Sequence, residues 1–250
     1  MTRASILQDG PLRVLGRLPD SSNNALLCSV TAPGGPDRVV YKPQAGERPL
    51  WDFPAGTLSR REAAAAELDD LLGWGLVPET VWREDGPAGP GIVQRWVEGD
   101  IDIGIFPPGE VLAGWVPVVD AETGDGPVVV AHRDDEQTLR MIVFDAIANN
   151  ADRKGGHLLR RDPDLFGIDH GVTFHEEPKL RTVLWGKAGS PVPAELLGAV
   201  EGALPGFDRL ARWLTGAEVS AARRRALGLL DAGRFPTPGG QWPALPWPLI

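Results

Sequence analysis

The 250-residue sequence contains a single cysteine, Cys28, so it forms no internal disulfide and no metal cluster made of cysteines alone. It also lacks any apolar run near the roughly 18 residues that a membrane-spanning helix needs. Its first residues do not contain the apolar stretch of a signal peptide. We therefore expect a cytoplasmic protein without stable membrane association.

Lysine is scarce as well: only 4 of the 25 basic residues are lysines, and the net charge is −9. Nonspecific binding to nucleic acid or to anionic lipid depends on positive surface, which an acidic chain offers poorly. The hydrophobic content of 42% is ordinary for a globular protein, and the length suits one large domain or two packed lobes. These values favour a globular protein that does not bind nucleic acid.

The first hundred residues predict a small sheet with one helix. Alternating apolar residues and turn signals indicate five strands, near 11–18, 25–32, 38–43, 77–84 and 89–98. The run of alanines and leucines over 57–72 predicts a helix that Gly73 ends. Together these elements form a compact sheet-and-helix unit.

The second half is mostly helical in pattern. Residues 100–127 show no clear periodicity, whereas 135–150 predict a largely buried helix. Short strands are expected at 157–161 and 165–169, and amphipathic helices at 193–204, 207–216 and 218–233. The proline- and tryptophan-rich tail from residue 235 is expected to pack on the surface.

Lys42 ends the third strand, where its ammonium group can point into a cleft. Phosphoryl transfer needs such a lysine to hold phosphates, together with a carboxylate that fixes it. Glu62 in the next helix is a candidate partner, and Glu67 is a second. The alternative is that Lys42 is a solvated strand end and that Glu62 closes a capping box with Ser59.

The loop between the first two strands offers small residues whose amides can surround phosphate oxygens. Ser21, Ser22 and Asn23 are the candidates, although the loop lacks the glycine pattern of a nucleotide-binding fingerprint. It is equally well explained as a simple turn.

Two aspartates follow the buried helix on loops. Asp152 comes just after the helix end, and Asp169 follows a short hairpin that returns to the same place. Two carboxylates brought together in this way can share a divalent cation and orient a hydroxyl group. By contrast, His132 lies in an acidic stretch and is expected in a surface loop.

Five stretches together resemble a known family: VVYKPQAGERPLW, SRREAAAAELDDLLG, GLVPETV, NNADRKGGHLL and FGIDHGVTF. They resemble the phosphatidylinositol 3-/4-kinase-like branch of the protein-kinase-like fold, most of all type II phosphatidylinositol 4-kinases and their short actinobacterial relatives. The resemblance covers about residues 12–190. It implies an α+β, two-lobed fold: an antiparallel-sheet N-lobe with one main helix (1–97) and a mostly helical C-lobe (98–250).

The resemblance also implies roles for individual residues. Lys42 would bind the phosphates of ATP and Glu62 would pair with it. Asp152, followed by Arg153, would orient the acceptor, and Asp169 would bind Mg²⁺. The adenine would lie against a hinge formed by Gln94, Arg95, Trp96 and Val97, with Trp96 as a wall.

One position departs from the family pattern. Five residues after the catalytic aspartate the family has a metal-binding asparagine, and this chain has His157. Because imidazole suits Mn²⁺ better than Mg²⁺, we expect the site to use Mg²⁺ or Mn²⁺. If His157 is only a hairpin residue, the protein is instead a nucleotide-binding pseudokinase or scaffold; AMP transfer on the same fold is a further alternative.

The acceptor would be recognised by the segment after Asp169. This segment contains Lys179, Arg181 and Lys187 around Trp185, a basic-aromatic group that could meet an anionic acceptor or be an ordinary solvated loop. We expect a small molecule or protein with a hydroxyl group, and a soluble acceptor rather than a lipid.

Overall fold

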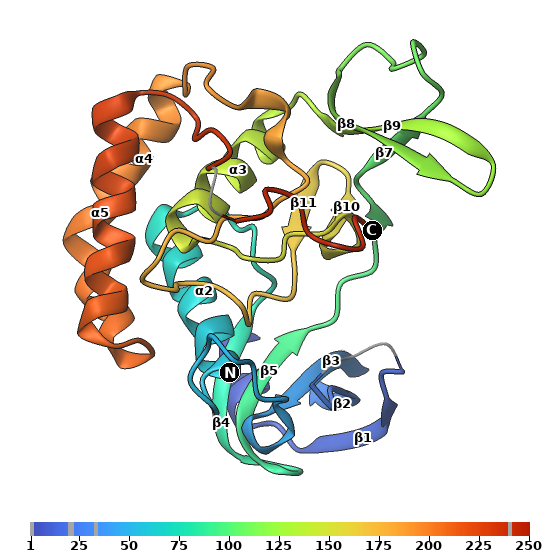
Figure 1. Ribbon diagram of the computed structural model, residues 1–250. Helices are drawn as coiled ribbons and strands as arrows, with labels where there is room; N and C mark the ends of the chain where they lie inside the picture. Colours follow the sequence, from blue (N-terminus) through green and yellow to red (C-terminus); the bar gives the residue numbers. More distant parts are fainter. Residues whose placement is uncertain (1–2, 20–22, 33–34, 240–241) are drawn as a thin grey trace.

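The computed structural model describes residues 3–19, 23–32, 35–239 and 242–250. An antiparallel five-stranded sheet occupies one end of the molecule (Figure 1). Its strand order is β1-β2-β3-β5-β4. The strands are β1 (Leu12–Arg17), β2 (Leu26–Ala32), β3 (Gly35–Pro43), β4 (Thr80–Gly86) and β5 (Gly89–Arg95). All five strands predicted from the sequence are present.

The side-chain alternation of β3 positions Lys42. Val39 and Tyr41 are fully buried in a small core with Ile6 and Leu7 of α1 (Arg3–Asp9). Because successive side chains of a strand point to opposite faces, Lys42 points away from this core, toward α2 (Leu58–Leu72). The predicted helix is therefore present, and it faces the lysine.

The start of α2 differs from the predicted capping box. The carboxylate of Glu47, just after η1 (Gln44–Gly46), accepts hydrogen bonds from the amides of Leu58 and Ser59 at 3.0 and 2.8 Å. This carboxylate satisfies the free amides at the helix start, so Glu62 does not close a box there. Glu62 is left available for Lys42.

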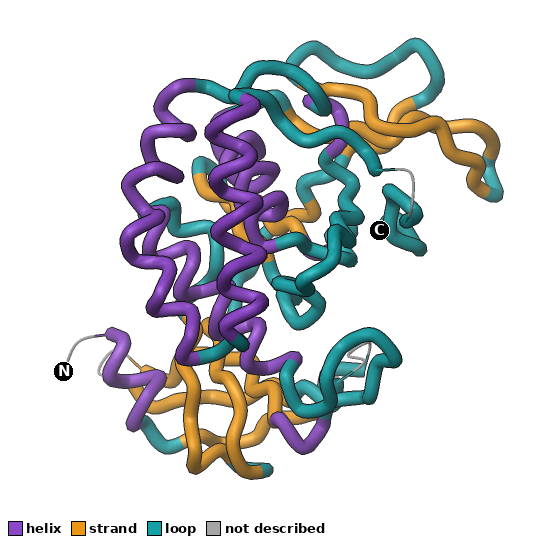
Figure 2. The backbone as a smooth tube through the Cα atoms, turned by 60° about the vertical axis from the view of Figure 1, so that its left-hand side comes forward, coloured by secondary structure: helices purple, strands orange, loops and turns teal. Residues whose placement is uncertain are grey.

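The larger part of the chain is built around helices. Figure 2 shows α2 and the later helices standing as a column on the sheet. Apart from α2, they are α3 (Glu136–Ala148), α4 (Ala194–Ala203), the 3₁₀ run η4 (Leu204–Arg212) and α5 (Gly216–Ala232). One buried apolar cluster joins α2, α3, α4 and α5. Residues 207–216, expected as an α-helix, lie mostly in the 3₁₀ run.

Two small sheets complete the second half. The sheet β11-β10-β6 contains the predicted short hairpin, and the sheet β7-β9-β8 projects from the molecule (Figure 1). Their strands are β6 (Asp100–Ile101), β7 (Gly104–Phe106), β8 (Trp115–Thr123), β9 (Gly126–Arg133), β10 (Leu158–Arg161) and β11 (Asp164–Gly167). The segment without clear periodicity, residues 100–127, thus contains β6, β7, β8 and the start of β9. His132 lies in β9 and is fully buried, so its prediction as a surface-loop residue was wrong.

The tail after α5 returns across the second half. The carbonyl oxygen of Leu249 accepts a hydrogen bond from the amide of Gly155 at 2.7 Å, and that of Ala244 accepts one from Thr182 at 3.1 Å. The tail is therefore packed, as predicted. The five-stranded sheet ends at Arg95, two residues before the predicted lobe boundary, and the division into lobes at residue 97 stays a prediction. None of the helices in the described ranges is long and apolar enough to cross a bilayer.

Candidate active site

Lys42 lies between two carboxylates from distant parts of the chain. Its Nζ is hydrogen-bonded to Oε1 of Glu62 and lies 3.3 Å from Oδ1 of Asp169. The Glu62 side chain is 3% exposed and that of Asp169 is 47% exposed. Strand β3, helix α2 and the loop after β11 therefore meet at one ammonium group that is partly open to solvent.

Electrostatics favour the charged forms of Lys42 and Asp169 and disfavour that of Glu62. Burial alone would lower the pKa of Lys42, but attraction by Glu62 and Asp169 outweighs it and raises that pKa. The nearby lysine lowers the pKa of Asp169, although its surroundings are partly desolvated. Burial raises the pKa of Glu62 more than Lys42 lowers it. Asp169 is therefore the carboxylate that is held most firmly as an anion, and its negative charge is available to a metal ion.

His157 lies on the other side of Asp169. Residues 155–157 form η2 (Gly155–His157), and Nε2 of His157 lies 3.6 Å from Oδ2 of Asp169. Burial lowers the pKa of His157, which favours the neutral imidazole that metals bind. The backbone of Asp169 has a φ of +59°, a left-handed conformation that non-glycine residues rarely adopt outside functional sites.

These side chains fit a divalent cation that is bound jointly with a substrate. No three His, Cys, Asp or Glu side chains within the described ranges are arranged to hold a metal ion by themselves. Mg²⁺ sites commonly use one or two protein ligands and complete their shell with phosphate oxygens and water. Asp169 and His157 supply such a pair.

Asp152 lies beside two cations. Its Oδ2 is 3.1 Å from Nζ of Lys154, and its Oδ1 is 3.9 Å from Nη2 of Arg181. Arg181 is held in place by a hydrogen bond of 2.6 Å from its Nε to the carbonyl oxygen of Ala151. About a quarter of the Asp152 side chain is exposed (26%), so a hydroxyl group from solvent can reach it.

Arg153 is adjacent to Asp152 in the chain but is fully buried. Its Nε and Nη2 each lie 2.9 Å from a carboxylate oxygen of Asp145 in α3. Nη1 donates to the carbonyl oxygen of Ile168 at 2.9 Å, and Nη2 lies 2.8 Å from Nε2 of His170. Arg153 therefore ties the loop of Asp152 to that of Asp169 and cannot touch a substrate.

The predicted hinge is largely engaged within the sheet. Gln94 is buried and donates to Oγ1 of Thr80 at 2.9 Å. The amides of Arg95 and Trp96 donate to the carbonyl oxygens of Glu79 and Arg38 at 2.8 and 3.0 Å. Nε1 of Trp96 is a buried donor with no partner in the described part of the chain.

The other residues predicted for the site either lie outside the described residues or bind elsewhere. Ser21 and Ser22 lie outside the described residues. Asn23 accepts a hydrogen bond from the amide of Arg48 at 3.1 Å through its Oδ1. Glu67, the second candidate partner of Lys42, pairs with Arg209 instead.

The basic-aromatic group after Asp169 does not form one patch. Lys179 is buried and pairs with Asp52 at 2.8 Å, and Lys187 pairs with Asp134 at 3.0 Å. Only Arg181 extends to Asp152. The sequence did carry a signal for Asp145, which sequence reasoning missed: a lone aspartate within the apolar run from residue 141 to residue 148.

Comparison with known proteins gives one relative and several similar folds. No protein-family model matches the chain. Protein Rv2133c of Mycobacterium tuberculosis is 47% identical over 263 residues, which cover 98% of this chain and 94% of the relative.

Among solved structures, hydra Fam20 with sugar has a TM-score of 0.53 at 14% identity and covers 92% of this chain and 86% of its own. The Golgi casein kinase with Mn/ADP bound has a TM-score of 0.55 at 11% identity, covering 92% and 74%. These similarities show a kinase-like fold, as the sequence predicted. They do not support the narrower resemblance to type II phosphatidylinositol 4-kinases.

Proposed function

We propose that the chain, which belongs to the family of the mycobacterial protein Rv2133c and has a kinase-like fold, is an ATP- and divalent-metal-dependent phosphotransferase. The observation that carries the proposal is the position of Lys42 between Glu62 and Asp169, with His157 behind Asp169. Phosphoryl transfer depends on positioning and charge neutralisation, and this group of residues supplies both.

Each residue then has a distinct task. Lys42 holds phosphate oxygens of ATP, and Glu62 fixes the lysine. Asp169 and His157 hold the metal ion, which neutralises charge on the phosphates when bound. Of the predicted hinge, Trp96 contributes an unpaired indole N–H that suits an acceptor atom of the adenine ring.

Asp152 acts on the acceptor. Its carboxylate accepts the proton of the acceptor hydroxyl as the hydroxyl oxygen bonds to the γ-phosphorus and the bond to the ADP oxygen breaks. Lys154 and Arg181 limit its motion through their charges. Arg153, because it is buried, is a positioning residue that holds the two loops together.

The proposal is tested with aspartate variants and labelled ATP. Asp152→Ala and Asp169→Ala are each expected to abolish metal-dependent ATP turnover, whereas Asp125→Ala, at an exposed hairpin tip, leaves it unchanged. Mass spectrometry of protein and metabolite extract distinguishes transferred phosphate from transferred AMP. Full turnover in either site variant contradicts the assignment.

His157→Asn separates an active enzyme from a pseudokinase. If His157 is a working ligand, the substitution alters turnover and shifts the preference from Mn²⁺ toward Mg²⁺, because amide oxygen is the harder ligand. ATP binding without turnover, in wild type and in His157→Asn, identifies a pseudokinase.

A further inference from the structure

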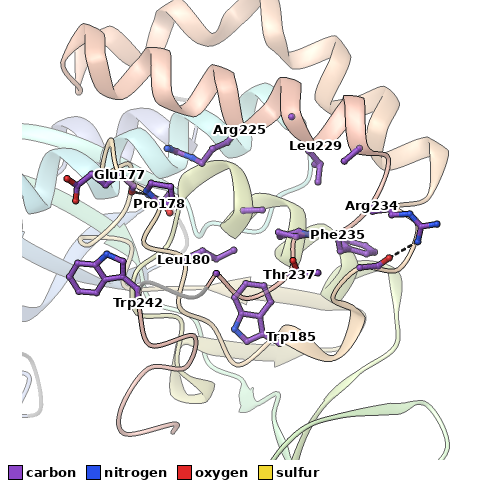
Figure 3. Close-up of a pocket in the computed structure, with 17 residues that line it drawn as sticks. Glu177, Pro178, Leu180, Trp185, Arg225, Leu229, Arg234, Phe235, Thr237 and Trp242 are labelled. Carbon is purple, nitrogen blue, oxygen red and sulfur yellow. Dashed lines mark hydrogen bonds between the residues drawn. The ribbon is translucent and has the colours of Figure 1, made fainter.

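A cavity of about 940 Å³ lies in the second half of the molecule and shares no residue with the proposed phosphotransfer site (Figure 3). One wall is α5, and the others are the end of α3, the segment 177–189 and the tail from residue 234. Its volume is at the upper end of the range of small-molecule sites in proteins. Four segments distant in sequence therefore enclose space for a ligand.

The wall of the cavity is mainly apolar and aromatic. Leu180, Leu229 and Phe235 lie around its middle, and the indole rings of Trp185 and Trp242 lie along one side (Figure 3). The Trp185 ring is fixed, since its Nε1 donates to the carbonyl oxygen of Ala244 at 2.8 Å. Such a surface fits a flat or chain-like apolar body.

The charges on the wall are unbalanced. Arg225 of α5 donates from Nε to the carbonyl oxygen of Ile147 at 2.8 Å and from Nη1 to that of His175 at 3.2 Å. Within the described ranges it has no carboxylate partner, and its enclosed Nη2 has no hydrogen-bond partner. Burial, and then its neighbour Arg224, lower the pKa of Arg225 to about 10.

A half-buried arginine without a counter-ion is energetically unfavourable, and an anion bound beside it would supply the missing charge. Arg234, at the exposed end of the lining, uses only Nη1, which donates to the carbonyl oxygen of Gly189 at 2.7 Å. Among the described residues that line the cavity, Glu177 is the only acidic one. The wall therefore carries a net positive charge in a chain that is acidic as a whole.

We propose that this cavity binds an anionic amphiphile: a small molecule with an apolar body along Leu180, Leu229 and Trp185 and an acid group near Arg225. The acid group interacts with the positive charge of the guanidinium of Arg225, which lines the cavity. The partly desolvated position of Arg225 makes that attraction stronger than one at the surface.

The test uses 8-anilinonaphthalene-1-sulfonate, an aromatic sulfonate whose fluorescence rises in apolar surroundings. Wild-type protein is expected to bind one dye molecule per chain in a saturable manner. Arg225→Met is expected to weaken binding about tenfold, the effect of losing one charge-assisted hydrogen bond. The neighbouring Arg224→Met is the matched control, since Arg224 is exposed and does not line the cavity.

A second pair of variants tests the cavity without touching a charge. Gly228 lines it, and a Cβ there meets no atom within 4 Å, so Gly228→Phe can fill the space while the helix forms. It should abolish dye binding, whereas Gly198→Phe, at an exposed and equally open position of α4, should not. Circular dichroism verifies the fold of each variant.

Head-group chemistry is examined by displacement. Decanoate and decyl phosphate are expected to displace the dye, and decanol is not. The acid that displaces the dye at the lower concentration shows whether a carboxylate or a phosphate is preferred. The proposal is overturned if wild type shows no saturable binding, if Arg225→Met binds like Arg224→Met, if Gly228→Phe still binds, or if decanol competes equally well.

Discussion

Arg153 and Asp145 form a pair whose energetics follow from their burial. Both side chains are essentially without solvent contact, at 0% and 1% exposure, and they meet through two hydrogen bonds of 2.9 Å. Removing one partner of such a pair leaves an uncompensated charge in the interior, which is far more harmful than losing a surface ion pair. The order of the two loops that carry Asp152 and Asp169 therefore depends on a buried residue outside the proposed site, Asp145.

We expect Asp145→Ala to reduce the free energy of unfolding by about 3–5 kcal/mol, measured by urea denaturation. Glu136→Ala in the same helix is the control. It removes the carboxylate from an i,i+4 pair with Arg140 in which Glu136 is 68% exposed, and should cost under about 1 kcal/mol. Equal effects of the two substitutions would show that the buried pair contributes no more to the free energy of unfolding than the exposed pair does.

At the scale of residues, the sequence predicted which side chains lie close together more accurately than it predicted the environment of each one. The proximity of Lys42, Glu62 and Asp169 follows from the motif order. The burial of Arg153 does not, because nothing in the pattern Asp-Arg indicates which way the second side chain turns. Likewise, the acidic residues after His132 suggested solvent, although its ring points into the protein from the end of a strand.

At the scale of elements, β9 joins the projecting sheet to the rest of the molecule. The ring of His132 at its end is fully buried, and Nδ1 lies 2.7 Å from the carbonyl oxygen of Arg133. A Cβ on Gly186 of η3 (Trp185–Lys187) would come within 2.7 Å of Nε2, so this strand and that turn are in close contact. Protonation of His132 would place a charge in the contact.

This contact gives a pH dependence of stability with a definite sign. Burial lowers the pKa of His132 below its ordinary value of 6.5. Below pH 6.5 the unfolded chain binds a proton that the folded chain does not, so stability is full above that pH and is lost as the pH falls. Lowering the pH from 7.5 to 5.5 should reduce the free energy of unfolding of wild type by up to about 1.4 kcal/mol more than that of His132→Asn, whose side chain cannot titrate. Urea denaturation at each pH measures the difference. Parallel pH profiles would contradict this account.

The elements that were predicted well are those whose pattern is local. The alanine-rich helix α2 contains its own stop signal, Gly73, and the hairpins of the first sheet contain their own turns. The hairpin β8–β9 was missed because β8 has no regular alternation of buried and exposed positions. Its glycine-rich turn was visible, but the strands could not be recognised without their partner.

For the molecule as a whole, the proposed site exists only when both halves are folded together. Lys42 and Glu62 come from the first hundred residues, while Asp152, His157 and Asp169 come from loops of the second half. A ligand that binds all of them stabilises the folded state by mass action. Stability therefore provides a measure of binding that does not require turnover.

ATP with Mn²⁺, at 100 times the dissociation constant, should raise the free energy of unfolding by about 2.7 kcal/mol, detected as an upward shift of the melting temperature. Asp169→Ala should abolish most of the shift and Asp125→Ala should retain it. Chelation of the metal should reverse the shift in wild type. An unchanged melting temperature under all conditions would argue against nucleotide binding.

Fold class could be read from the sequence because family motifs occur in a fixed order along the chain. The anion-binding cavity could not, since its wall combines four segments with no shared pattern. No periodicity indicates that Trp185 and Arg225 face the same space. Only packing brings them together.

The path of the last residues has a practical consequence. The carbonyl oxygen of Leu249 is bonded to Gly155, three residues after Asp152, and Ala244 holds the segment of Arg181 through Thr182. A fusion partner, affinity handle or fluorophore attached to Ile250 would therefore disturb the backbone of the loop that carries Asp152. Assays made with such an attachment would report on the label as much as on the protein.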